Sequence, residues 1–168
     1  MTESKYIWMD GEFVNWHDAK VHVLSHTLHY GNGAIEGTKA YKTVDGRCAI
    51  FKLNEHTQRL LNSSKMTLMN VPFTLEELNK AQIELLQKNE LFDGAYIRPL
   101  VYLGYGVMGL YHKEAPVKVS VSAWEWGAYL GEEGLRKGVR VKISSFTRTP
   151  NTSGMGKAKA VANYLNSQ

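Results

Sequence analysis

The chain has 168 residues, of which 43% are hydrophobic and 21% charged, and its formal net charge is +4 at pH 7. This composition is typical of a folded globular protein with a sizeable core and excludes an intrinsically disordered chain. No apolar run approaches the roughly 20 residues that span a bilayer, the N-terminus has no signal-peptide pattern, and Cys48 is the only cysteine. We therefore expect a cytoplasmic protein without an internal disulfide or a membrane partner.

The charges are distributed unevenly along the chain. All sixteen acidic residues lie at or before Glu133, and the 35 residues that follow carry seven basic residues and no acid. A basic segment can bind nucleic acid, but these basic residues stand singly among Val, Ile and Ser instead of forming a cluster. We expect no nucleic-acid partner, and a small molecule that carries a phosphate group suits the charge better.

Two β-hairpins are predicted in the first third of the chain. Asp10-Gly11 lies inside the run 7–14, and Asp45-Gly46 separates the runs 38–44 and 48–53, as two-residue hairpin turns do. Residues 22–37, between the hairpins, are rich in glycine and histidine and are expected to be irregular.

Three other motifs in this region carry weaker signals. His22, His26 and His29 have a spacing that suits metal ligands on a helix, but no Cys, Asp or Glu completes the set nearby, so packing histidines are preferred. The Gly31-Asn32-Gly33 run does not have dinucleotide-binding spacing. Cys48 precedes Ala-Ile-Phe and is expected to be a core cysteine.

Two helices are predicted next. Asn54 is a candidate N-cap for a helix that extends to about Met69. Thr74 and Glu77 have capping-box spacing for a helix that extends to about Asn89.

Three strands follow, at 95–105, 117–123 and 139–145, with a connector at 126–134 before the last. This order predicts an α/β (α+β) protein with a two-layer first domain, a linker and the beginning of a second domain. The expected bounds are 1–124 for the small N-terminal domain, 125–138 for the interdomain linker and 139–168 for the incomplete C-terminal domain.

Lys157 and Lys159 stand among small uncharged residues near the end of the chain. A lysine that is kept from water loses part of its preference for the ammonium form and becomes a candidate for imine formation. The alternative is an alanine-rich surface segment. Lysine chemistry by itself does not distinguish an imine-forming amine from an exposed surface segment.

Two arginines are candidate anion-binding residues. Arg59 lies about one turn into the helix predicted from Asn54, where a guanidinium and free backbone amides form a phosphate site; the alternative is a solvated helix-face arginine. Arg98 lies in an otherwise apolar strand, so a carboxylate of the protein or of a substrate is expected beside it.

Several motifs, in order and in register, resemble the branched-chain aminotransferases, and the resemblance covers essentially the whole chain. These motifs are His22-Val-Leu-Ser-His-Thr-Leu-His-Tyr-Gly31, Ile35-Glu-Gly-Thr-Lys-Ala-Tyr41, the helix with His56 and Arg59, Ala95-Tyr-Ile-Arg-Pro-Leu100, Trp126-Gly-Ala-Tyr-Leu-Gly131 and Lys159-Ala-Val-Ala-Asn-Tyr164. The resemblance implies a fold-type IV enzyme of pyridoxal 5'-phosphate, in which the cofactor lies between a small N-terminal and a larger C-terminal domain.

The resemblance also implies roles for individual residues. Lys159 would be the catalytic Schiff-base lysine, with Lys157 as the less favoured candidate, Arg59 would hold the cofactor phosphate, and Tyr164 would lie near the ring oxygen. The implied substrate-binding residues are Tyr96 and Arg98 for carboxylates, Tyr129 on the pocket wall, Trp126 in the covering linker, Ile35 where an aromatic residue is frequent, and Tyr30 and Leu110 at positions lent to the partner subunit.

The activity implied is transamination between branched-chain L-amino acids (Leu, Ile, Val) and 2-oxoglutarate by a homodimer or higher homo-oligomer. The family continues past this lysine and there supplies the carboxylate that pairs with the pyridine nitrogen, whereas no acid follows Glu133. We therefore expect the chain to be the front part of a longer protein. The alternatives are a D-amino acid aminotransferase or an aminodeoxychorismate lyase of the same fold, a non-catalytic fragment, or a basic RNA-binding module.

Overall fold

The computed structural model of the protein describes residues 2–127, 131–148, 150, 152 and 154–167. The strands are β1 (Tyr6–Met9), β2 (Glu12–Asn15), β3 (Gly33–Ile35), β4 (Thr38–Lys42), β5 (Cys48–Ile50), β6 (Gly94–Leu103) and β7 (Val117–Trp124). The α-helices are α1 (His26–Tyr30), α2 (Leu53–Met66), α3 (Leu75–Lys88) and α4 (Gly131–Lys137), and short 3-10 helices cover Trp16–Asp18 and Val161–Ser167.

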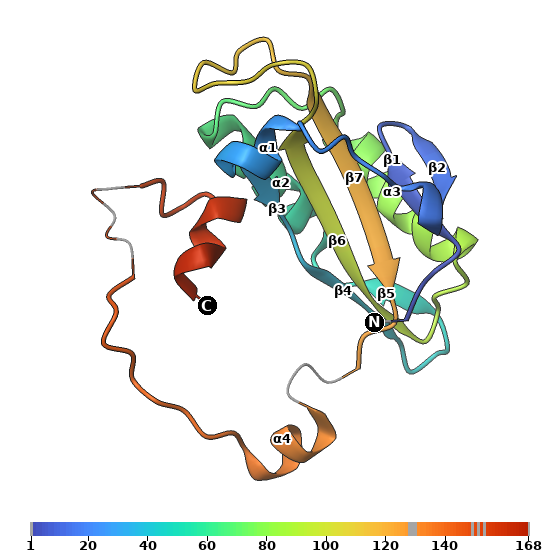
Figure 1. The fold of residues 1–168 in the computed structure, drawn as a ribbon. Coiled ribbons are helices and arrows are strands. Elements are labelled where there is room, and N and C mark those ends of the chain that lie inside the picture. Colours follow the sequence, from blue (N-terminus) through green and yellow to red (C-terminus); the bar gives the residue numbers. More distant parts are fainter. Residues whose placement is uncertain (1, 128–130, 149, 151, 153, 168) are drawn as a thin grey trace.

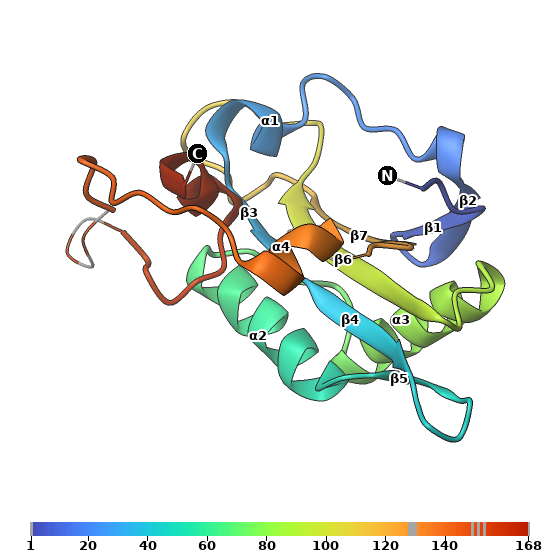
Figure 2. The ribbon, with the colours of Figure 1, turned by 90° about the horizontal axis from the view of Figure 1, so that it is seen from below.

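An antiparallel sheet forms the centre of the fold, with the strand order β2-β1-β7-β6-β4-β5, and β3 pairs with β6 beside this path (Figure 1). Helices α2 and α3 pack against one face, while α1 and the C-terminal segment lie on the other side of the sheet (Figure 2). The expected α/β (α+β) architecture with two layers is confirmed.

Strand β6 separates the core from the opposite face of the sheet. Its side chains alternate along the strand, so Ala95, Ile97 and Val101 are buried under the helices. Tyr96 and Arg98 point the other way and remain partly accessible. The hydrophobic core therefore fixes the direction of both polar side chains.

The first hairpin and the second helix agree with the local sequence signals. Asp10 and Gly11 join β1 to β2 with positive φ values of 50° and 105°, as a two-residue hairpin turn requires. At the start of α3, Thr74 accepts a hydrogen bond from the backbone N–H of Glu77, whose carboxylate accepts one in return. Both predictions are confirmed.

Asn54 is not the N-cap of α2, and that prediction is wrong. The helix begins at Leu53 after Lys52, which has a left-handed φ of 57°. The Asn54 side chain instead accepts a hydrogen bond of 2.6 Å from the amide of Asn79 on α3. Contacts between the two helices therefore override the local capping signal.

Three further expectations are corrected. The region 22–37 contains α1 and β3, and α4 begins inside the predicted connector at Gly131 and extends beyond it to Lys137. The strand predicted at 139–145 is absent: Val141 and Ile143 are 89% and 95% exposed, and no described strand pairs with this segment. An alternating sequence forms a strand only where a partner completes its hydrogen bonds. Of the helices described, none combines the length and apolar character needed to cross a membrane.

The packing of α3 yields a stability prediction. Leu85 is fully buried between helix and sheet, whereas Ile83, two residues earlier, is 43% exposed. Leu85→Ala is expected to lower the free energy of unfolding by about 2–5 kcal/mol, because it removes core contacts and leaves a cavity. Ile83→Ala should lower the free energy of unfolding by clearly less. Urea titration followed by circular dichroism measures both, and equal losses would contradict this account of the core.

Candidate functional site

Aromatic side chains gather around Tyr96 on the face of the sheet opposite to α2 and α3. The ring centroid of Tyr96 lies 5.1 Å from that of Trp124 and 4.6 Å from that of Trp126, the latter in an edge-to-face arrangement. Strand register explains the first contact, because Tyr96 is directly opposite Trp124 in the β6–β7 pair. These rings form an apolar wall at the end of the sheet where β7 ends at Trp124.

Arg98 lies next to this wall. Its Nη2 and Nε donate to the Tyr96 hydroxyl at 2.7 and 3.2 Å, and its guanidinium lies 5.1 Å from the centre of the Tyr96 ring. Within the described residues no carboxylate lies within ion-pair distance of Arg98. Of the two expected partners, a carboxylate of the protein or one of a substrate, the described part of the chain therefore does not supply the first. Its charge is available to an anion from outside.

The Tyr96 hydroxyl also lies against the backbone at Gly37. A Cβ at this glycine would overlap the Tyr96 hydroxyl oxygen, so a larger residue requires the ring to move. Gly37 in turn donates its backbone N–H to Glu36 at 3.3 Å. The two residues Glu36 and Gly37 therefore link the Tyr96 and Arg98 pair to a second group of charges.

Glu36 is the centre of that second group. Its carboxylate is fully buried and accepts hydrogen bonds from Arg59 Nε at 2.5 Å and Arg59 Nη2 at 2.8 Å, in a two-pronged pair. His56 Nδ1 lies 2.9 Å from the same carboxylate. Sequence reasoning missed this role of Glu36. The signal was present, because Glu36 is the only acid between Asp18 and Asp45 and is flanked by an isoleucine and a glycine.

The electrostatics of the pair favour the ionised state. Burial by itself raises the pKa of the Glu36 carboxyl, but the hydrogen bonds from Arg59 and His56 outweigh it and hold that pKa below its ordinary value of 4.5. The bond to Glu36 raises the pKa of Arg59, and the nearby Tyr164 adds to this rise. Arg59 lies in the second turn of α2, beyond the free amides of the helix start, so Glu36 and not the helix terminus orients it.

Lys159 is held beside β3 by its backbone. Its carbonyl accepts the N–H of Ile35 at 3.0 Å, and Ala160 forms an isolated antiparallel bridge with Ala34. Its own N–H donates to the Ser63 hydroxyl on α2 at 3.0 Å. Since Ala158 and Ala160 are buried on either side, the Lys159 backbone is fixed on the domain surface.

The side chains of Lys159 and Tyr164 meet. Lys159 Nζ donates a hydrogen bond to the Tyr164 hydroxyl and lies 4.9 Å from the centre of that ring. Lys157, two residues earlier, is exposed. The structure thus brings Arg59 on α2 and Ile35 on β3 close to Lys159 and Tyr164, which lie far from them in the sequence.

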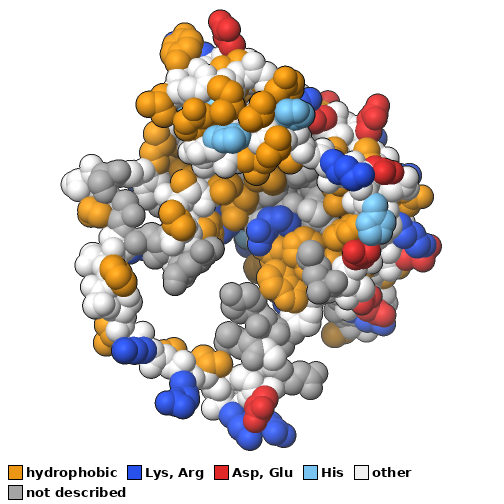
Figure 3. Space-filling view, viewed as in Figure 1, with side chains coloured by type: hydrophobic (Ala, Val, Ile, Leu, Met, Phe, Trp, Pro, Cys, Tyr) orange, Lys and Arg blue, Asp and Glu red, His pale blue; other side chains and the backbone are white. Residues whose placement is uncertain are grey.

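The remaining candidates lie elsewhere. Trp126 contacts Tyr96, as described, and Tyr129 is outside the described residues. Tyr30 on α1 accepts the backbone N–H of Gly109 at 3.2 Å, next to Leu110, which is 85% exposed. Hydrophobic side chains cover this end of the molecule (Figure 3). The exposed members are Val23, Leu24, Leu28, Tyr30, Tyr105, Met108, Leu110 and Tyr111, and we call this set the apolar end.

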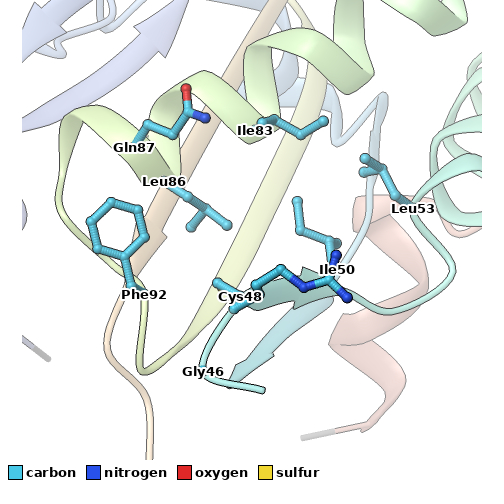
Figure 4. Close-up of a pocket in the computed structure, with 9 residues that line it drawn as sticks. Gly46, Cys48, Ile50, Leu53, Ile83, Leu86, Gln87 and Phe92 are labelled. Carbon is cyan, nitrogen blue, oxygen red and sulfur yellow. The ribbon is translucent and has the colours of Figure 1, made fainter. Parts of the chain in front are cut away.

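A cavity of about 600 Å³ lies away from all these residues, between β5 and α3 (Figure 4). Its wall is mostly apolar and includes Cys48, Ile50, Leu86 and Phe92. Burial raises the pKa of the Cys48 thiol, and this side chain packs against the core, which agrees with the prediction of a core cysteine. None of the candidate site residues lines this cavity.

Known proteins resemble this chain over almost all of its length. It is 47% identical over 161 residues to the branched-chain-amino-acid aminotransferase of Pseudomonas aeruginosa, a match that covers 96% of this chain and 52% of that relative. The enzyme of the same name from Escherichia coli K12 is 43% identical over 171 residues, or 99% of this chain and 54% of that one. The chain therefore spans about half the length of these relatives.

Solved structures agree with this similarity. The fold matches the T.th. branched-chain amino acid aminotransferase with pyridoxamine 5'-phosphate at a TM-score of 0.91 and 46% identity, over 99% of this chain and 54% of that one. It matches the Escherichia coli enzyme at a TM-score of 0.90 and 41% identity, over 98% and 54%. The family model for amino-transferase class IV matches residues 33–167. A match that runs from β3 through the Lys159 segment shows that the chain belongs to the class IV aminotransferases.

Proposed function

We propose that the complete gene product catalyses pyridoxal-phosphate-dependent transamination between branched-chain L-amino acids (leucine, isoleucine and valine) and 2-oxoglutarate. The amino group of the first substrate then passes to the second, which gives a branched 2-oxo acid and glutamate. The observation that carries the proposal is the meeting of Lys159, Tyr164 and Arg59 in a class IV aminotransferase chain. Relatives that bear the branched-chain name support the substrate class.

The described residues fit the cofactor. Arg59 is 52% exposed at its side chain and directs Nε and Nη2 to Glu36, and no described residue accepts a hydrogen bond from its Nη1, which can therefore donate to a phosphate oxygen. Lys159 Nζ supplies an amine and the Tyr164 hydroxyl a hydrogen-bond partner for the ring oxygen. When bound, pyridoxal phosphate supplies an aldehyde that condenses with amines, with loss of water, and a ring that withdraws electrons from the neighbouring carbon.

We assign the covalent bond to Lys159 rather than to Lys157. Lys159 is partly buried between two buried alanines, and its Nζ donates a hydrogen bond to the Tyr164 hydroxyl, the proposed partner of the cofactor ring oxygen. With the cofactor bound, the Lys159 Nζ would be the group placed to accept and return a proton at the substrate Cα. Lys157 is exposed and takes no part.

Arg98 and the aromatic wall provide the substrate side of the site. Arg98 has a hydroxyl and no described carboxylate as its partner, which suits the carboxylate of an amino acid or of 2-oxoglutarate. Tyr96 and Trp126 offer apolar surface for a branched side chain, and Ile35 contributes a smaller wall than an aromatic residue would. We propose that Tyr129 completes this wall.

The apolar end supports a homodimer or higher homo-oligomer in which Tyr30 and Leu110 reach the partner's pocket, because apolar patches of this kind mark interfaces.

We also propose the division into a small domain at 1–124, a linker at 125–138 and the beginning of a second domain at 139–168. The exposed Val141 and Ile143 support it, since such side chains require a further layer to cover them. A cytoplasmic location completes the proposal.

The covalent assignment is tested by borohydride reduction of the complete gene product with pyridoxal phosphate. We expect a pyridoxyl adduct on the peptide with Lys159 and loss of that adduct in Lys159→Ala. Lys157→Ala is the matched control and should keep it, because its side chain is exposed. Peptide mass spectrometry reads the result, and an adduct on Lys157 would move the assignment.

The substrate role of Arg98 predicts a kinetic effect. Arg98→Gln is expected to lower kcat/KM for leucine by roughly 10- to 100-fold, the factor for one hydrogen-bonded ion pair. Cofactor binding should persist, because Arg59 and Lys159 are untouched. Arg47→Gln is the control, since Arg47 is exposed and pairs with Asp45 on the hairpin. An unchanged kcat/KM in Arg98→Gln would place the carboxylate elsewhere.

The lowered pKa of Glu36 predicts a pH dependence of stability. A carboxyl whose folded pKa is below 4.5 stabilises the fold fully above that pH, and the contribution is lost as pH falls through the lower folded value. The difference in unfolding free energy between the parent protein and Glu36→Gln should therefore shrink below about pH 4.5.

Urea titrations across that range measure this difference. Glu84→Gln is the matched control, because Glu84 forms only a surface pair with Lys80 at 3.7 Å. Its effect should stay below about 0.5 kcal/mol. A difference for Glu36→Gln that is independent of pH would contradict the ionised state of Glu36.

A further inference from the structure

Ser63 connects two parts of the candidate site that are remote in sequence. It lies on α2 one turn after Arg59, and its side chain is almost completely buried. Its hydroxyl oxygen accepts the backbone N–H of Lys159 at 3.0 Å, across 96 positions of the chain. One helix therefore carries both the arginine assigned to the phosphate and the group that holds the lysine backbone.

The Lys159 segment has little freedom on its other side. Ile35 donates its N–H to the Lys159 carbonyl at 3.0 Å, so both backbone polar groups of Lys159 are bonded to the domain. The following residues pack closely on β3: a Cβ at Gly33 would lie 3.0 Å from a methyl of Val161 and 3.1 Å from the Val101 carbonyl oxygen. Close packing fixes the Lys159 segment on β3, and the hydrogen bond to Ser63 fixes the same segment relative to α2.

We propose that Ser63 is a positioning residue for Lys159, which sets the separation between the Arg59 guanidinium and the Lys159 amine. The inference rests on the proposed function. Consecutive turns of a helix are about 5.4 Å apart, so Arg59 and Ser63 give a rigid spacing between the two anchor points. A ring held at its phosphate by Arg59 meets the lysine amine only if that spacing is kept, because bond formation depends on orientation.

Ser64 offers a matched control on the same helix. It is also fully buried, but its hydroxyl donates to the Leu60 carbonyl within α2 at 2.9 Å. Ser63→Ala and Ser64→Ala therefore remove the same atom at adjacent buried positions. Only the first removes an acceptor from the Lys159 backbone.

The experiment compares two ligands on the complete gene product. Pyridoxal 5'-phosphate bonds covalently to the lysine amine, whereas pyridoxamine 5'-phosphate has the same ring and phosphate but no aldehyde. Ser63→Ala should weaken the affinity for pyridoxal phosphate by roughly three- to tenfold, the factor for one neutral hydrogen bond, and leave the affinity for pyridoxamine phosphate unchanged. Ser64→Ala should leave both affinities unchanged.

Hydrogen exchange supplies a second readout that needs no cofactor. In Ser63→Ala the Lys159 amide should exchange faster by a similar factor, while the amides of α2 keep their protection. Unchanged protection at Lys159 would overturn the contact itself.

The outcomes separate this inference from the proposed function. If the parent protein forms no borohydride adduct on Lys159, the proposed function fails and the positioning role fails with it. If the adduct forms but Ser63→Ala behaves as Ser64→Ala does, the positioning role alone is overturned. Equal weakening of both ligands by Ser63→Ala also overturns it, because that result indicates a general loss of structure.

Discussion

The alternation of side chains along β6 is the constraint on which the rest of this structure depends. The strand pairs with β3, β4 and β7, and α2 packs on one of its faces while α3 packs on the neighbouring β7. Because neighbouring residues of a strand face opposite ways, burial of Ile97 beneath the helices requires Tyr96 and Arg98 to face the other side. A shift of one residue would exchange the buried and the accessible side chains of β6, so the same hydrophobic packing that stabilises the fold also orients Tyr96 and Arg98, for which we propose a role in substrate binding.

The buried carboxylate of Glu36 holds Arg59, for which we propose a role in binding the cofactor phosphate. A fully buried charge is tolerated only when hydrogen bonds compensate it, and Arg59, His56 and Gly37 supply them. The guanidinium of Arg59 is thereby fixed although its side chain is half exposed. A fixed cation binds an anion more tightly than a mobile one does, because less conformational entropy is lost when the anion binds.

Helix α2 contacts two parts of the chain that are remote from each other in the sequence. Its residues Arg59 and Ser63 contact Glu36 and the Lys159 backbone, which come from opposite ends of the chain. Residues 139–146 contrast with this fixed arrangement, because Val141, Ile143 and Phe146 expose most of their side chains.

The sequence alone determined the elements whose signals are local. The Asp10-Gly11 turn requires positive φ, the Thr74 and Glu77 pair caps its own helix, and the motifs in register identify the family. Only the tertiary structure decided which distant residues meet: that Glu36 holds Arg59, that Ser63 holds Lys159, and that residues 139–145 do not form a strand here. The physical reason is the sequence separation between the groups that interact. Turns and caps are completed within a few residues, whereas buried ion pairs, strand partners and backbone anchors depend on groups that the fold brings from far along the chain.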